Sequence, residues 1–546
     1  MTRLIGVFEN NLFDLLNLIP EIYLLANVVF CLMYLSFYAG RSLHFAYFKV
    51  AFVFMQLSVF SCFLLHILNT YFWPASTLQV YLGGYLINDP FSFFFKIFIS
   101  FLALLCGFIS YSYYEGQNMR TYEYTLLTAF SLMSSMLLVS SYDLISFYLT
   151  MELISFCLYT LAASRFNSVY SVEAGIKYFV HGCCVSGIYV FGVALFFLMT
   201  GTTNYYNLHL HLNNFFVDLV EVTSFAEVNI LELIFLAVAI SSTLILPLFK
   251  IALVPYHFWV ADVYEGSPLP VTAYFSIVIK VVMTASVIRI LYGLFLSFLP
   301  LLKYFLLFFG LVSVIIGTLS ALSEQKVKRI LAFSSIGHSG YIILGLVPMK
   351  YSSLGASINY VVIYAVTNVL IFAFLLATIS LKVDSLNRYV VYVSDLGLLK
   401  NTNFSLSFCF SIALLSFSGL PPFAGFFAKF YVFYELWLAG HTLSVVLMIL
   451  MSFVSTYYYL RFIKCLFFSP NLRSAYLVQN DIVNKVVISL LAFFLVFYSL
   501  WAAQINLVSI NVGVSVVPLH LDEHYLQYLD FIAEDKIANF VHGFRT

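Results

Sequence analysis

The chain has 546 residues, of which 62% are hydrophobic and only 9% are charged, and its mean hydropathy is +0.99. A soluble domain of this length would need far more polar surface to cover its core, so the composition excludes a soluble protein and predicts an all-α polytopic membrane protein. The 25 basic and 25 acidic residues balance each other, which gives no indication of a nucleic-acid partner.

A bilayer-length window predicts about fourteen spanning helices. They are predicted to begin near Leu18, Phe45, Phe91, Tyr122, Asp143, Ala174, Leu231, Pro268, Leu301, Ile330, Leu354, Asn403, Thr442 and Val486. The tail after Trp501 reads as an amphipathic surface helix rather than as a further span.

The charges of the predicted loops indicate the orientation of the chain. Of the lysines and arginines in loops between predicted helices, most follow odd-numbered helices, such as Lys326, Lys328 and Arg329. The long segment after the sixth helix, Gly201 to Ile230, has acidic residues but no lysine or arginine. Because basic loops stay on the cytoplasmic or matrix side, we expect both chain ends and residues 201–230 to lie on the opposite side.

Two predicted helices are interrupted by proline and glycine. The seventh contains Pro247, three residues before Lys250, and the twelfth contains the sequence SGLPPFAG before Lys429. Broken segments at corresponding places in two blocks are typical of transporters with inverted repeats. We therefore predict helices 4–8 (121–292) and 9–13 (293–468) as two inverted five-helix repeats, flanked by helices 1–3 (1–120) and by helix 14 with its tail (469–546).

Ionisable residues recur within these apolar helices, where a lysine near the bilayer centre costs at least about 2.5 kcal/mol. They are Glu152, Lys177, Lys250, Lys280, His338 and Lys429. Lysine, histidine and glutamate can change protonation when they are dehydrated or paired, so such a series can pass protons along the membrane. An arginine could not, because it keeps its proton. The alternative is that each residue belongs to a buried pair that positions helices.

The remaining chemistry-bearing residues indicate no cofactor site. The 8 cysteines are scattered, and we interpret them, including the adjacent Cys183 and Cys184, as core residues. Asp262, Glu265 and His257 resemble a metal-ligand set, but we interpret them as a loop motif at a helix end. The first residues show no import signal. The 60 phenylalanines and 40 tyrosines suggest an AT-rich genome, such as that of an organelle.

Five segments together resemble the antiporter-like membrane subunits of respiratory complex I, and most of all the subunit 2 branch of that family. They are MELISFCLYTL, SVEAGIKYFV, FKIALVPYHFWVADVYEGSPLPV, VKRILAFSSIGHSGY and SFSGLPPFAGFFAKFYVF. The resemblance covers roughly Asp89 to Phe468 and implies a fold of fourteen helices. The segments outside these limits match no pattern of the family, and residues 201–230 are longer than expected.

The resemblance also assigns expected roles to the ionisable residues. Glu152 and Lys250 match the charged pair of the family, Lys280 its central lysine and Lys429 its terminal lysine, where subunit 4 has a glutamate. Lys177 matches the lysine of the SxEAxxKYF motif. This chain would then translocate protons in a complex that transfers electrons from NADH to ubiquinone.

The same resemblance implies that FMN, iron–sulfur clusters and ubiquinone are bound by partner subunits and that this chain holds no redox centre. Expected partners are other membrane-arm subunits, including paralogous antiporter-like ones, together with lipids. The expected location is the mitochondrial inner membrane, with a bacterial plasma membrane as the alternative. Two other functions remain open: a subunit of a multi-subunit cation/proton antiporter, and a non-pumping scaffold of the same fold.

Overall fold

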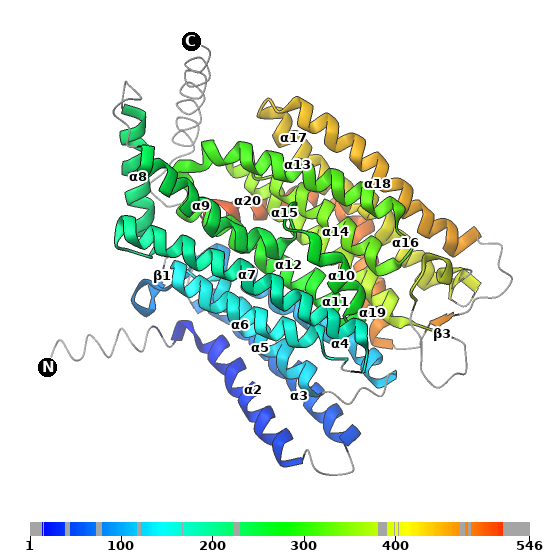
Figure 1. The fold of residues 1–546 in the computed structure, drawn as a ribbon. Helices are drawn as coiled ribbons and strands as arrows, with labels where there is room; N and C mark the ends of the chain where they lie inside the picture. Colours follow the sequence, from blue (N-terminus) through cyan, green and yellow to red (C-terminus); the bar gives the residue numbers. More distant parts are fainter. Residues whose placement is uncertain are drawn as a thin grey trace.

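The structure, a computed structural model, describes residues 14, 16–38, 44–72, 79–116, 122–165, 167–221, 230–380, 390–397, 399–401, 403–468, 476–478 and 482–516. Most of these residues are helical and form one bundle (Figure 1). Within the described ranges, eleven helices are long and apolar enough to cross a membrane, and shorter apolar helices accompany them. The predicted class, an all-α polytopic membrane protein, is therefore confirmed.

Three helices and a hairpin form the first part of the bundle. The helices are α2 (Ile19–Tyr38), α3 (His44–Phe72) and α4 (Pro90–Gly116). Strands β1 (Gln79–Tyr81) and β2 (Leu86–Asn88) pair in antiparallel fashion between α3 and α4. Figure 1 shows α2 and α3 along one edge of the molecule, where they contact each other and α5 (Tyr122–Val139).

The next part of the chain contains the most enclosed helix. Its elements are α6 (Leu144–Ala162), α7 (Val169–Thr200), α8 (Tyr205–Glu221), α9 (Ile230–Ile251), α10 (Phe258–Gly266), α11 (Leu269–Tyr274) and α12 (Lys280–Arg289). The π-helical segment Phe275–Ile279 joins α11 and α12 into one continuous helical rod. A second π-helical segment, Ile290–Leu294, extends this rod beyond α12. Every residue of its most apolar window is buried, because α4, α5, α9 and α15 surround α12.

The second half of the bundle also contains long helices around an enclosed one. Its helices are α13 (Leu299–Ser323), α14 (Val327–Leu344), α15 (Tyr351–Ala377), α16 (Phe404–Ser418), α17 (Ala424–Leu438) and α18 (Thr442–Phe468). Glycines let α13 and α14 approach closely, since a Cβ on Gly317 would lie 2.5 Å from the main-chain nitrogen of Gly337. Such small-residue contacts hold helices together in lipid, where no hydrophobic force does so.

The chain ends with two more helices and a short strand. These are β4 (Tyr476–Val478), which pairs with β3 (Thr378–Ser380), then α19 (Ile482–Phe497) and α20 (Ala502–Val514). Helix α20 is apolar and packs against α15. The prediction of a surface helix directly after Trp501 is therefore wrong for residues 502–514, and the rest of that tail, from residue 517, lies outside the described residues.

A helix corresponds to each of the predicted spans. The largest difference lies in the sixth, which begins at Val169 rather than at Ala174. The acidic segment after it, predicted as a long loop, instead contains α8, and residues 222–229 lie outside the description. The division into two inverted repeats stays a prediction.

Both predicted helix breaks are present, but the first lies in a different place. Helix α9 passes through Pro247 and ends at Ile251, and α10 begins at Phe258. Proline removes the donor to the carbonyl of Thr243 but has a helical φ, so the helix continues for another turn. The second break lies where the sequence indicates it, because Gly419 ends α16 in the left-handed region with φ +81° and α17 begins at Ala424.

Candidate proton pathway

Four of the six candidate residues are buried inside the bundle. Lys250, Lys280, His338 and Lys429 have exposed fractions of 4%, 4%, 6% and 5%. Each lies on a helix that crosses the bundle or on half of a broken one, as the cost of placing a charge in hydrocarbon requires. Glu152 on α6 and Lys177 on α7 are both partly exposed.

Lys250 lies in the last turn of α9, directly before the first break. A cation is favoured there, because the unpaired carbonyls give the end of a helix a partial negative charge. Its Nζ donates to the hydroxyl of Tyr159 at 3.4 Å and lies 4.7 Å from the ring centre of Tyr178. Among the ion pairs of the described residues there is none between Lys250 and Glu152, so the charged pair that the resemblance implies is not a direct one.

Lys280 begins α12, immediately after a π-helical segment. Such segments disturb the regular hydrogen bonding of a helix and often mark functional sites. The ammonium of Lys280 crosses to α14, where its Nζ donates to the carbonyl of Ser335 at 2.7 Å. It also lies 5.8 Å from the ring centre of Tyr364, which contacts His338 through rings 5.4 Å apart. Lys280 and His338 therefore share a neighbour.

His338 is held by two tyrosine hydroxyls. Its Nδ1 lies 2.8 Å from the hydroxyl of Tyr360, and its Nε2 lies 3.1 Å from that of Tyr459. A neutral imidazole donates from one nitrogen and accepts at the other, and a hydroxyl can serve either, so both tautomers are accommodated. The residue thus has a polar neighbour on each side of its ring.

Lys429 and His338 line the same small cavity of about 10 Å³. Tyr360, Tyr364 and Phe417 also contribute to its wall. Lys429 further lies 5.6 Å from the ring centre of Tyr341, which stacks on Tyr360. The structure therefore brings Lys280, His338 and Lys429 together through shared tyrosines.

Aromatic rings, rather than polar links, separate Lys250 from Lys280. Tyr178 stacks on Trp259 with ring centres 4.6 Å apart and contacts Phe275 of the π-helical segment at 5.8 Å. In the described part of the chain, no hydrogen bond joins the two lysines directly. A proton that passes between them needs water or side-chain movement across this aromatic layer.

Lys177 lies apart from the buried residues. Its side chain is 39% exposed and its Nζ lies 2.8 Å from both Glu173, four residues earlier, and Asp262 on α10. Its position at the charged edge of the bundle differs from the prediction of a residue within the buried series. The Glu173 pair is a helix-surface contact that spacing alone favours.

The same charged edge connects α10 to α14. Arg329 contacts Asp262 at 3.3 Å and Glu265 at 3.2 Å, and Lys326 is hydrogen-bonded to Glu265. That hydrogen bond raises the pKa of Lys326 above its ordinary value. The interpretation of Asp262 and Glu265 as loop residues is wrong, because both lie within α10, where they pair with cations. This network fixes the second half of the broken helix.

Sequence reasoning missed several buried charges and the tyrosines. Glu21 on α2 and Lys96 on α4 form an ion pair of 2.7 Å, and Asp89 pairs with Arg289 at 2.8 Å. The rule that found Lys280, a charge inside an apolar run, would also have found Lys96. The interpretation of the cysteines as core residues holds for Cys157 but is wrong for Cys183 and Cys184, which are exposed on α7.

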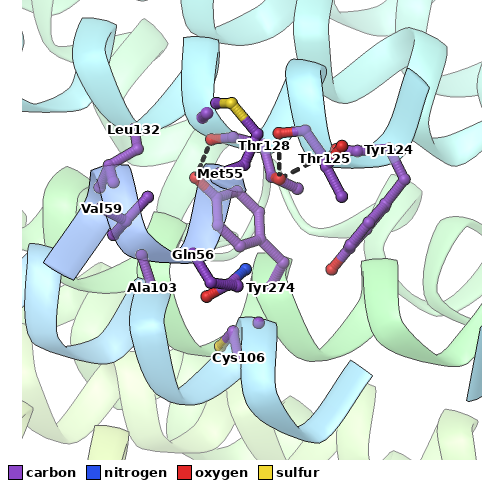
Figure 2. Close-up of a pocket in the computed structure, with 12 residues that line it drawn as sticks. Met55, Gln56, Val59, Ala103, Cys106, Tyr124, Thr125, Thr128, Leu132 and Tyr274 are labelled. Carbon is purple, nitrogen blue, oxygen red and sulfur yellow. Dashed lines mark hydrogen bonds between the residues drawn. The ribbon is translucent and has the colours of Figure 1, made fainter. Parts of the chain in front are cut away.

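A second polar cavity lies beside the enclosed helix, between α3, α4 and α5 (Figure 2). Its volume is about 20 Å³, which is enough for one water molecule. Tyr274 projects into it, and its hydroxyl donates to the carbonyl of Thr128 at 3.3 Å and lies 2.8 Å from Ser131. Gln56 also faces it and is accommodated only because Gly107 has no side chain.

Comparisons with known proteins agree with the motifs. Residues 141–455 match the family described as NADH:quinone oxidoreductase/Mrp antiporter, TM. NADH-ubiquinone oxidoreductase chain 2 of Marchantia polymorpha is 34% identical over 427 residues, which cover 78% of this chain and 83% of that protein. NADH-quinone oxidoreductase subunit N of Bartonella bacilliformis is 34% identical over 421 residues, which cover 76% and 82%.

Solved structures share the fold. A chain of respiratory complex I from Thermus thermophilus superposes with a TM-score of 0.69 at 25% identity and covers 89% of this chain and 98% of that one. A chain of the Mrp complex from Dietzia sp. superposes with a TM-score of 0.74, covering 94% and 99%, at 19% identity. The second likeness concerns the fold alone.

Proposed function

The chain belongs to the NADH:quinone oxidoreductase/Mrp antiporter family as an antiporter-like membrane subunit of complex I, and from this premise we propose that it translocates protons. The observation that carries the proposal is the burial of Lys250, Lys280, His338 and Lys429 in one bundle, where neighbouring side chains link three of them. A purely structural membrane helix rarely has such groups, because each is costly unless it has a partner or a role.

In this proposal, electron transfer from NADH to ubiquinone takes place in partner subunits that hold FMN and the iron–sulfur clusters. A change transmitted from the quinone site alters the electrostatic balance between Glu152 and Lys250. Lys250 then passes a proton toward Lys280, and His338 and Lys429 carry it on. Lys177 pairs with Asp262 of α10 at the charged edge, beside the first break.

The proposed setting is the mitochondrial inner membrane, which the plant relatives favour, with other membrane-arm subunits as neighbours. The exposed apolar faces of helices such as α7 and α18 would contact lipid or those subunits. Co-purification separates this proposal from a cation/proton antiporter. Flavin and iron–sulfur clusters in the purified complex support the first, and their lack would overturn it.

The pumping itself is tested by Lys280→Met in the whole complex reconstituted in proteoliposomes. Methionine nearly keeps the shape of lysine but cannot hold a proton. We expect an assembled complex that pumps fewer protons for each NADH oxidised. Lys400→Met is the control, since Lys400 lies between spans and donates to the carbonyl of Phe467. Normal pumping by Lys280→Met would favour a non-pumping scaffold.

A further inference from the structure

Three polar side chains form a stripe along helix α6. Glu152, Ser155 and Tyr159 follow the spacing i, i+3 and i+7, which places them on one face of a helix. The hydroxyl of Ser155 lies 3.2 Å from Oε2 of Glu152 and 2.9 Å from its carbonyl, both of which can accept from it. Tyr159 follows Ser155 by four residues, one turn further along the same face. The far end of the stripe meets Lys250, whose Nζ lies 3.4 Å from the hydroxyl of Tyr159.

Tyr159 is fixed in this position by its aromatic neighbours and by a glycine. Its ring stands edge-on to Tyr178 at 4.9 Å and to Phe179 at 5.6 Å. Its hydroxyl lies against Gly182 of α7, where a Cβ would overlap with it. The close approach of α7 thus requires glycine at this position.

We propose that the hydroxyls of Tyr159 and Ser155 form the proton bridge between Glu152 and Lys250. This inference rests on the proposed function. It says how a proton passes between Glu152 and Lys250, which form no direct ion pair. A hydroxyl can accept one proton while it donates another, which a phenylalanine or an alanine cannot do.

The bridge moves one proton without leaving a charge on either hydroxyl. The ammonium of Lys250 gives a proton to the oxygen of Tyr159, and the phenolic proton of Tyr159 passes to Ser155. The hydroxyl proton of Ser155 passes to the carboxylate of Glu152. The net result is a neutral Lys250 and a protonated Glu152, and the same steps in reverse restore the charged pair.

Because Glu152 is partly exposed, the bridge can connect the surface of α6 with the enclosed Lys250. Lys250 is enclosed, whereas Glu152 lies near the outer face of α6, among exposed side chains such as Leu149 and Leu153. A change at the neighbouring surface therefore acts first on Glu152. The two hydroxyls pass that change to the enclosed lysine.

The first test is Tyr159→Phe in the reconstituted complex. Phenylalanine keeps the ring contacts with Tyr178 and Phe179 but removes the hydroxyl. We expect normal assembly and at least a tenfold lower rate of coupled pumping, with a changed solvent deuterium isotope effect on that rate. A role that is only structural would not change the isotope effect. Pumping at the wild-type rate would overturn the proposal.

Two matched pairs of variants keep the test decisive if Tyr159→Phe fails to assemble. Gly182→Ala pushes the hydroxyl away, whereas Gly187→Ala adds the same methyl group to α7 where no atom lies within 4 Å. We expect only the first to lower pumping. Ser155→Ala should lower it and Ser155→Thr, which keeps a hydroxyl, should not. Equal effects within each pair would overturn the bridge.

Lys280→Met distinguishes a failure of the proposed function from a failure of the bridge. If that variant pumps normally, the proposed function itself is wrong. If Lys280→Met stops pumping while Tyr159→Phe, Gly182→Ala and Ser155→Ala all pump normally, the function stands and only the bridge is overturned.

Discussion

Lys429 of α17 donates a hydrogen bond of 2.9 Å from its Nζ to the carbonyl of Ser418, the last residue of α16. Lys429, on the second half of the broken helix, thus places its positive charge at the negative C-terminal end of the first half. Lys250 occupies the corresponding end of α9 but lies on that helix itself. Both breaks therefore place a cation where unpaired carbonyls favour it, by different routes.

Substitutions of Lys429 separate a proton relay from a structural cation. Lys429→Met should leave the complex assembled and lower coupled quinone reduction by about tenfold or more, a modest part of what positioned proton-transfer groups contribute. Lys429→Glu should retain more activity, because a dehydrated carboxyl can still gain and lose a proton. Lys429→Arg should resemble Lys429→Met, since its charge is permanent.

A structural cation predicts the opposite order for these variants. Arginine would be tolerated best, as it can still donate to Ser418, and glutamate worst. Proton pumping in proteoliposomes at matched assembly measures the order. Arginine at the wild-type rate with an inactive glutamate variant would contradict the relay.

Gly419 gives a second test of the position of Lys429. A Cβ on Gly419 would lie 2.8 Å from Cδ of Lys429, so Gly419→Ala should displace the ammonium and lower pumping. Gly440→Ala is a matched control. Gly440 has φ +82°, close to the +81° of Gly419, but no atom lies within 4 Å of its Cβ position.

Both alanines carry the same left-handed backbone strain, about 1–2 kcal/mol. Any difference in pumping therefore reports the contact with Lys429. The ratio of protons pumped to NADH oxidised is the quantity to measure. Equal losses in the two variants would mean that strain alone is responsible.

The sequence allowed the buried cations to be predicted because their physical cost is local. A lysine in an apolar run such as that of Lys280 must face protein, and the structure confirms this. Lys177 differs because it was counted with the residues inside apolar helices although it lies only three residues after the predicted start of its helix at Ala174. It lies near the start of α7, and the acid four residues earlier already indicates a helix-surface pair.

The tyrosines could not be predicted from the sequence. The chain has 40 tyrosines, and nothing in the sequence distinguishes those at the pathway from the others. Only the packing of α6, α7 and α9 selects Tyr159 from this background. The position of the first break could not be predicted from the sequence either, because a membrane helix can continue through a proline such as Pro247.

The orientation of the chain can be tested with a pair of cysteine reporters. Asn207→Cys on α8 and Asn167→Cys after α6 are both at exposed positions on opposite predicted sides. Exposed Cys183 and Cys184 are first replaced by serine. An impermeant maleimide should label residue 207 from the intermembrane side and residue 167 from the matrix side.

The opposite result for either residue would overturn the predicted topology. Labelling of both from one side would mean that the number of spans between them is even. The measurement uses mitoplasts and intact inner-membrane vesicles of inverted orientation. Because both changes are Asn→Cys, differences in labelling do not come from the residue introduced.

The last prediction concerns the ion pair of Glu21 and Lys96, which are 3% and 1% exposed. Removing one partner leaves a buried charge alone, which costs about 3–5 kcal/mol, whereas replacing both is often close to neutral. Lys96 also donates to Oδ1 of Asn88 at 3.2 Å, so its loss leaves a second group without that bond. Lys96→Met should therefore lower the melting temperature of the purified complex strongly, and Glu21→Gln with Lys96→Met should restore most of it. Lys177→Met at the exposed edge should change stability by at most about 1 kcal/mol. Strictly additive effects of Glu21→Gln and Lys96→Met would show that the pair does not hold α2 against α4.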